Sequence, residues 1–205
     1  RGSCSHENRP LGDTAPRNNL LYYAKDERSL SPMSYNCLCG LINHAASLVA
    51  IPNPAVNSYK RINAPRTVSG ATWAPNTVTF GGNNRTHMVR IPDAGRTEFR
   101  LPDNAANPYL MLAGIMVAGF HGIDAKMDPG KRLDIDMYTQ GHTVKGAKKW
   151  PLNLLDALRN LEKDTYLLNA LGDEVSTGYL KLKHAEWNQY CRHLTQWERD
   201  TTLDC

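Results

Sequence analysis

The sequence comprises 205 residues, of which 41% are hydrophobic and 21% are charged, and this composition excludes a disordered or fibrous chain. The length is sufficient for one ordinary domain or for one piece of a larger domain. The formal net charge of +4 is smaller than nucleic-acid-binding proteins usually carry, and no stretch approaches the roughly 20 apolar residues of a membrane span. We therefore expect a globular fold that binds neither nucleic acid nor membrane.

The first predicted helix covers residues 31–50 and follows a loop-like stretch, residues 1–30, with a short strand near residues 20–23. Ser31 before Pro32 is typical of an N-cap with proline at the first helical position. Apolar residues then recur at helical spacing until two prolines end the pattern. Cys37 and Cys39 belong to this apolar pattern, and one intervening residue is a poor zinc spacing, so we interpret them as core residues.

The five cysteines show no Cys-x-x-Cys spacing, which favours free thiols in a reducing compartment. No charged-then-apolar leader opens the sequence. From these two features we expect a cytoplasmic location.

Short antiparallel strands are predicted between residues 57 and 102, because glycine and proline punctuate runs of strand-like composition. The runs are residues 77–80, 87–91 and 96–100. An apolar helix over residues 109–123 follows, and its nearly uniform hydrophobicity predicts burial of most of its surface.

The last third of the sequence predicts helices over residues 152–162, 164–171 and 174–199, after a polar excursion over residues 124–149. The expected inner face of the last helix consists of Leu180, Leu182, Trp187, Tyr190, Leu194 and Trp197. Together the elements predict one α+β domain, with an antiparallel sheet backed by helices.

Arginine is concentrated in the predicted β region, at Arg61, Arg66, Arg85, Arg90, Arg96 and Arg100. Side chains two residues apart on a strand share a face, so Arg96, Glu98 and Arg100 should project together. Guanidinium groups flanking a carboxylate suit a site that binds phosphate or carboxylate oxygens and a divalent cation. Phosphoryl transfer is the chemistry that such a site favours.

An alternative interpretation makes these arginines solubilising residues of edge strands, with Glu98 as a salt-bridge partner. His6, alone in a glycine-bearing loop, would then be an ordinary surface residue. The known glycine-rich phosphate loops and hydrolase nucleophile signatures are absent from the sequence. Composition and spacing leave these alternatives open.

Four ordered motifs extend the pattern: NPAVNSYKR at residues 53–61, NRTHMVRIP at 84–92, RTEFRLPD at 96–103 and ANPYL at 106–110. In order and spacing they resemble the carboxy-terminal catalytic region of glutamine synthetases. Residues 61–76 and the ending from Trp187 are most similar to the type III branch, which is close to γ-glutamylmethylamide synthetases.

The resemblance implies ATP-dependent ligation of ammonia or a small amine to the side-chain carboxylate of glutamate, through γ-glutamyl phosphate. The residue roles that it implies fall into three groups. Arg61 and Arg100 would bind the glutamate carboxylates. Arg85, Arg90 and Arg96 would bind the phosphates of ATP, with Arg85 and Arg90 as catalytic residues, and Glu98 would bind Mg²⁺ or Mn²⁺.

The amino-terminal stretch resembles the family's Asn-Gly-x-Gly-x-His motif less closely. By this resemblance His6 would be a second protein ligand of the cation, and Gly2 would lie near the glutamate ammonium group. Three positions depart from the motif, namely Arg1, Cys4 and Pro10. Pro10 stands where the family has a serine on the nucleotide side, so a hydroxyl group and an N–H group are missing there. This departure puts nucleotide binding through this stretch in question.

The family's flap carboxylate would fall near Trp73, and no acidic residue lies between Arg61 and Arg85. Tryptophan cannot act as a base. This departure favours a larger, less polar amine such as methylamine, or a proton acceptor supplied elsewhere.

The resemblance also makes residues 1–205 a partial catalytic domain, without the amino-terminal β-grasp domain and the first half of the catalytic domain. We expect such a fragment to be inactive by itself. The parent would be a ring-shaped homo-oligomer with sites between subunits. Two other hypotheses are a γ-glutamyl-alkylamide or polyamine ligase, and a catalytically silent structural or regulatory homologue.

Overall fold

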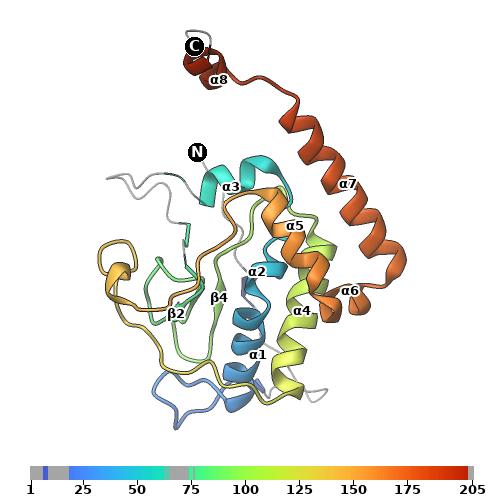
Figure 1. The fold of residues 1–205 in the computed structure, drawn as a ribbon. Helices are drawn as coiled ribbons and strands as arrows, with labels where there is room; N and C mark the ends of the chain where they lie inside the picture. The colour runs from blue at the N-terminus through green and yellow to red at the C-terminus, as the bar shows by residue number, and fades with distance from the viewer. Residues whose placement is uncertain (1–6, 9–18, 63, 65–73, 76, 203–205) are drawn as a thin grey trace.

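The architecture is an α+β fold in which a small sheet packs against helices, as seen in a computed structural model (Figure 1). The structure describes residues 7–8, 19–62, 64, 74–75 and 77–202. Its strands are β1 (Glu7–Asn8), β2 (Phe80–Gly81), β3 (Val89–Arg90) and β4 (Glu98–Phe99). The α+β class expected from the sequence is confirmed.

The four strands form one sheet in the order β1-β4-β3-β2. β1 and β3 both pair antiparallel with β4, whereas β2 pairs parallel with β3. The expectation of a wholly antiparallel sheet was therefore wrong at the β2–β3 pair. The connection over residues 82–88 runs back along β2 before β3 begins, and His87 in this connection packs against Gly81.

The predicted first helix is interrupted, giving α1 (Pro32–Asn43) and α2 (Ala45–Leu48). Ser31 is the N-cap, as predicted, and its hydroxyl accepts a hydrogen bond from the Ser34 amide at 3.2 Å. His44 separates the two helices, and its ring lies between Asp164 and His121 at 2.6 and 2.7 Å. These contacts join the junction between α1 and α2 to His121 in the later apolar helix and to Asp164, which precedes the helix over residues 165–171.

The apolar helix is α4 (Pro108–Asp124), which packs along α1 (Figure 1). Its N-cap is Asn107, whose side chain accepts from the amides of residues 109 and 110. Burial covers only the face toward α1 and the core, while Tyr109, Met116 and Phe120 are 82%, 40% and 42% exposed. The predicted burial of most of its surface was wrong, because the elements packed on α4, mainly α1 and also α2 and the helix over residues 165–171, leave part of its surface uncovered.

The remaining helices are α3 (Val56–Ile62), α5 (Leu154–Lys163), α6 (Thr165–Leu171), α7 (Asp173–Cys191) and α8 (Gln196–Thr202), with a 3-10 turn over Gly141–Thr143. α7 packs on α3, α5 and α6, and Figure 1 shows the chain beyond it leading away from the sheet. Leu182, Leu194 and Trp197 are exposed. The prediction of one helix with a single inner face was therefore wrong. α7 ends at Cys191, so that Leu194 and Trp197 lie beyond it, and Leu182 is exposed within α7 itself.

The core lies between the sheet and α1, α2, α4 and α5, and its largest fully buried side chains include Leu48, Met88, Ile91, Leu101 and Leu158. Within the described ranges, no helix combines the length and apolar character required to cross a membrane.

Candidate active site

A buried charge cluster lies where β3 and β4 pair. The register puts Arg90 opposite Glu98, and its Nη1 atom lies 2.7 Å from Glu98 Oε2. Arg100 reaches the other carboxylate oxygen, with its Nη1 atom 2.6 Å from Oε1. The Glu98 and Arg100 side chains are only 5% and 4% exposed. Two guanidinium groups thus flank one carboxylate, as the sequence predicted.

The second arginine of this cluster is not the predicted one. Arg96 pairs instead with Asp93 at 2.5 Å, and both side chains are largely exposed. The prediction extended strand geometry to residue 96, but β4 begins only at Glu98. The cross-strand register therefore brings Arg90 into the position expected for Arg96.

The connection before β3 is tied to the cluster through its side chains and backbone. Asn83 Oδ1 accepts from Arg90 Nε at 3.0 Å, and a second guanidinium nitrogen of Arg90 also donates to it. Arg100 Nε donates to the Arg85 carbonyl at 3.1 Å. The Arg85 side chain is exposed. The backbone of Arg85 thus lies beside two guanidinium groups that are held in fixed positions.

Arg61, on α3, forms a second basic position. Its Nη2 atom donates to Asn53 Oδ1 at 2.9 Å and to the Leu101 carbonyl at 2.6 Å, while Asp103 lies 3.9 Å from its Nε atom. Arg61 Nε and Asn53 Nδ2 are buried without a hydrogen-bond acceptor among the described residues. Buried donors of this kind are costly unless a partner satisfies them, and the Asp103 carboxylate is the nearest described anion to the Arg61 Nε atom.

Gly2 and His6 lie outside the described residues, as do Arg1, Cys4, Pro10, Arg66 and Trp73. The described strand β1 follows His6 in the sequence and pairs with β4, so that Asn8 lies opposite Glu98. The predicted roles of Gly2 and His6 remain predictions.

Glu98 has the donor chemistry of a ligand for Mg²⁺ or Mn²⁺, since both ions prefer oxygen. A carboxylate oxygen can accept more than one contact, so its ion pairs are compatible with this role. No group of three or more metal-ligating side chains gathers in the described part of the chain. Glu98 therefore fits one position of a cation site, and groups outside those residues would have to complete it.

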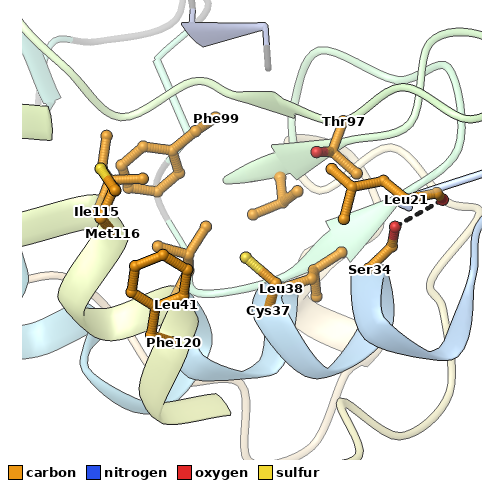
Figure 2. A pocket seen from close by; sticks show the side chains of 12 residues that line it. Leu21, Ser34, Cys37, Leu38, Leu41, Thr97, Phe99, Ile115, Met116 and Phe120 are labelled. Atoms are coloured by element: carbon orange, nitrogen blue, oxygen red, sulfur yellow. Dashed lines mark hydrogen bonds between the residues drawn. The ribbon is translucent and has the colours of Figure 1, made fainter. Parts of the chain in front are cut away.

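An apolar cavity of about 100 Å³ lies on the other face of the sheet, between β3, β4, α1 and α4 (Figure 2). Val89 and Phe99 line it, whereas their neighbours Arg90 and Glu98 form the charge cluster, as the alternation of a strand requires. Burial raises the pKa of the Cys37 thiol, which also lines the cavity. This thiol therefore stays protonated, but Cys37 and Cys39 are both only half-buried, so the prediction that they are core residues was wrong.

Sequence reasoning assigned no role to His87, which is fully buried. Its Nδ1 atom lies 2.9 Å from Thr79 Oγ1, and its Nε2 atom lies 3.0 Å from the Ile135 carbonyl. Burial lowers the pKa of His87 below its usual range. A histidine directly before the apolar residues Met88 and Val89 was the available signal, but only the fold shows its partners.

This lowered pKa predicts that the chain loses stability as the pH falls below about 6.5, the ordinary histidine pKa. In that range the unfolded chain binds a proton that buried His87 does not, so acid favours unfolding, by up to about 1.4 kcal/mol per pH unit. Urea unfolding at several pH values between 7.5 and 5 measures this slope. His87→Gln should show a shallower slope, and equal slopes would contradict the assignment.

Residues 1–202 match the family model described as "Glutamine synthetase, catalytic domain". A glutamine synthetase of Rhizobium leguminosarum bv. phaseoli is 57% identical over 203 residues, covering 99% of this chain and 47% of the relative. A glutamate–methylamine ligase of Methyloversatilis universalis is 40% identical over 208 residues, covering 99% of this chain and 46% of the relative.

A solved structure of a GmaS/ADP complex has a TM-score of 0.92 and 58% sequence identity, covering 100% of this chain and 46% of that one. A ligand-free GmaS structure has a TM-score of 0.88 and 55% identity, covering 98% of this chain and 44% of that one. The chain thus spans about half the length of the proteins that it matches.

Proposed function

Because this chain belongs to the glutamine synthetase catalytic-domain family, we propose that its parent protein joins an amine to the side-chain carboxylate of glutamate at the expense of ATP. The observation that supports this most strongly is the cluster of Arg90, Glu98 and Arg100 beside the exposed Arg85. Fixed guanidinium groups around one carboxylate are suited to phosphoryl transfer, where positioning and charge neutralisation supply most of the catalysis.

The proposed reaction has two steps. A glutamate carboxylate oxygen attacks the γ-phosphorus of ATP, and the bond to the β-phosphate oxygen breaks to release ADP. The amine nitrogen then attacks the carbonyl carbon of the γ-glutamyl phosphate, the bond from that carbon to the phosphate oxygen breaks to release inorganic phosphate, and the nitrogen loses a proton to give the amide. When bound, Mg²⁺ or Mn²⁺ would neutralise phosphate charge.

Arg85 and Arg90 are proposed to bind the transferred phosphoryl group, with Glu98 as a ligand of the cation. Arg90 is held by Asn83 and Glu98, so its guanidinium group is positioned before substrate binds. Arg96 is proposed to contact phosphate at the rim, because it is an exposed cation outside the cluster. His6 is proposed as a second ligand of the same cation.

Arg61 and Arg100 are proposed to bind the glutamate carboxylates, with Gly2 near the ammonium group. The guanidinium group of Arg61 is held by Asn53 Oδ1 and the Leu101 carbonyl, and a guanidinium group in a fixed position suits a carboxylate. Arg100 would act from within the cluster, where Glu98 and the Arg85 carbonyl fix its guanidinium plane.

The amine is proposed to be ammonia or methylamine. Similarity to a glutamate–methylamine ligase and to GmaS structures supports methylamine, as does the absence of an acidic residue between Arg61 and Arg85. The 57% identity to a glutamine synthetase supports ammonia. By its family, the parent is proposed to be cytoplasmic and to form a ring-shaped oligomer with sites between subunits.

We expect residues 1–205, joined to the preceding half of the R. leguminosarum relative, to form a chimaera that consumes ATP only when glutamate and an amine are both present. Phosphate release and mass spectrometry of the amide product measure this activity with ammonium and with methylamine. A greater kcat/KM for ammonium than for methylamine would show that methylamine is not the preferred substrate. A folded chimaera that makes neither amide would favour the silent homologue, and the 205-residue chain alone should be inactive.

A further inference from the structure

The connection between β2 and β3, residues 82–88, carries Asn83 and Arg85, and we call it the arginine loop. It is fastened to residues 133–137, which lie about fifty positions later and which we call the clamp segment. Asn84 Nδ2 donates to the Ile135 carbonyl at 2.9 Å, and the Met137 amide donates to Thr86 Oγ1 at 2.9 Å. The Gly82 amide donates to Asp134 Oδ1 at 3.1 Å.

His87 lies at the centre of this junction with no exposed surface. The Ile135 carbonyl can only accept, so His87 Nε2 carries the hydrogen and donates to it at 3.0 Å. The Nδ1 atom then accepts from the Thr79 hydroxyl at 2.9 Å. One ring thereby joins β2, the arginine loop and the clamp segment, in a single tautomer.

Glycine at residue 81 allows this arrangement. A Cβ atom built there would lie 2.4 Å from His87 Cδ2 and 2.6 Å from the Leu133 carbonyl oxygen. The ring and the clamp segment therefore lie directly against the β2 backbone. Because the contact leaves no space, the position of the arginine loop depends on the ring rather than on a flexible surface side chain.

Movement of the arginine loop would reach the charge cluster through several hydrogen bonds, one of which joins the Met88 carbonyl to the Arg100 amide at 2.9 Å. Asn83 holds the guanidinium group of Arg90, and the Arg85 carbonyl accepts from Arg100 Nε. None of the described contacts of His87 is with these arginines. His87 therefore acts on these arginines indirectly, through the backbone and side chains of the loop to which it belongs.

We propose that His87 is a positioning residue for the ligase reaction, and that it acts by clamping the arginine loop to residues 133–137. The proposal rests on the proposed function, since the arginines that it positions are those assigned to phosphate. Misplacement of a catalytic group by about 1 Å can lower a rate by about 100-fold, so a small shift of the loop is sufficient.

The test compares two substitutions of His87 in the chimaera. His87→Leu removes both hydrogen bonds, and kcat should fall about 10- to 100-fold at a temperature where the protein is fully folded. His87→Gln can place a donor near the Nε2 position, so it should recover activity to within about fivefold of the unsubstituted chimaera.

Leu158→Ala is the matched control, because Leu158 is equally buried but lies on α5, away from the loop. It should lower the melting temperature without changing kcat or the KM for ATP of the folded protein. If His87→Leu behaves in the same way, losing stability but not kcat, the positioning role is wrong.

Amide hydrogen exchange separates this proposal from the proposed function, because it needs no activity. In the 205-residue chain, His87→Leu should speed exchange at residues 82–90 more than at α5, whereas Leu158→Ala should show the reverse. An inactive unsubstituted chimaera would overturn the ligase assignment while exchange still reported on the clamp. Unchanged exchange at residues 82–90 would overturn the clamp itself.

Discussion

Glu98→Gln should lower the ligase activity of the chimaera by at least about 100-fold, an effect of the size seen when one stabilising group is lost from an active site. The substitution keeps the side-chain shape but removes the charge between Arg90 and Arg100, which lie 2.7 and 2.6 Å from its oxygens. It also removes the carboxylate proposed to bind the cation. Steady-state rates measured over a range of Mg²⁺ or Mn²⁺ concentrations should show that added cation does not restore turnover.

The same substitution should destabilise the fold. Arg100 is 4% exposed, so the substitution removes the carboxylate charge that faces a buried guanidinium group. Breaking a buried ion pair on one side costs about 3–5 kcal/mol. Thermal or urea unfolding of the 205-residue chain measures this loss, and activity assays should use temperatures below the lowered midpoint.

Asp93→Asn provides the matched control, because it breaks the Asp93–Arg96 pair, whose side chains are 68% and 45% exposed. Such surface pairs contribute about 0–1 kcal/mol, since solvent screens them. We expect stability close to that of the unsubstituted chain and activity within about threefold. Similar losses from both substitutions would contradict a special role for the buried cluster.

Gly40→Ala should destabilise the chain by about 3 kcal/mol, near the upper end for overpacking. Gly40 lies where α1 crosses α4, and a Cβ atom built on it would lie 2.0 Å from the Ala118 carbonyl oxygen. The obstacle is backbone, which cannot rotate away as a side chain can, so the helices must separate. Urea unfolding measures the free energy, with circular dichroism to confirm that both helices persist.

Gly178→Ala is the control for this effect, because it places the same methyl group on the exposed side of α7, where a Cβ atom meets nothing within 4 Å. Alanine favours helix over glycine by about 1 kcal/mol, so this variant should be slightly more stable. Opposite signs for the two substitutions would support close packing of α1 on α4. Stabilisation by both would show that the close approach is not required.

The buried cluster illustrates how stability and chemistry compete in this fold. Replacement of a buried ion pair by well-packed apolar residues is often neutral or stabilising. Retaining Glu98 between Arg90 and Arg100 is therefore better explained by the proposed chemistry than by stability. The matched pair of substitutions at Glu98 and Asp93 addresses this distinction.

Local signals in the sequence determined much of the secondary structure. Ser31 with Pro32 located the start of α1 because a side-chain acceptor and a fixed φ act within one turn. The motifs around Arg61, Arg85, Arg90 and Arg100 identified the family, since their order and spacing are properties of the chain alone. The family model then matched residues 1–202.

Predictions failed where burial depends on distant neighbours. α4 is apolar throughout, but only its face toward α1 and the core is covered, and the residues beyond α7 lead away from the body. Periodicity identifies which residues can share a helix face, but not whether another element covers that face. Exposed Leu194 and Trp197 are the result.

Tertiary structure alone decided which arginines meet Glu98. Spacing by two predicted Arg96, but the pairing of β3 with β4 put Arg90 there, because register depends on how two separate strands align. The hydrogen bonds that hold the arginine loop to the clamp segment could not be predicted either, since His87 and Ile135 are 48 residues apart in sequence. The sequence alone determined the residue types available for chemistry, whereas their partners depended on long-range packing, which no local pattern encodes.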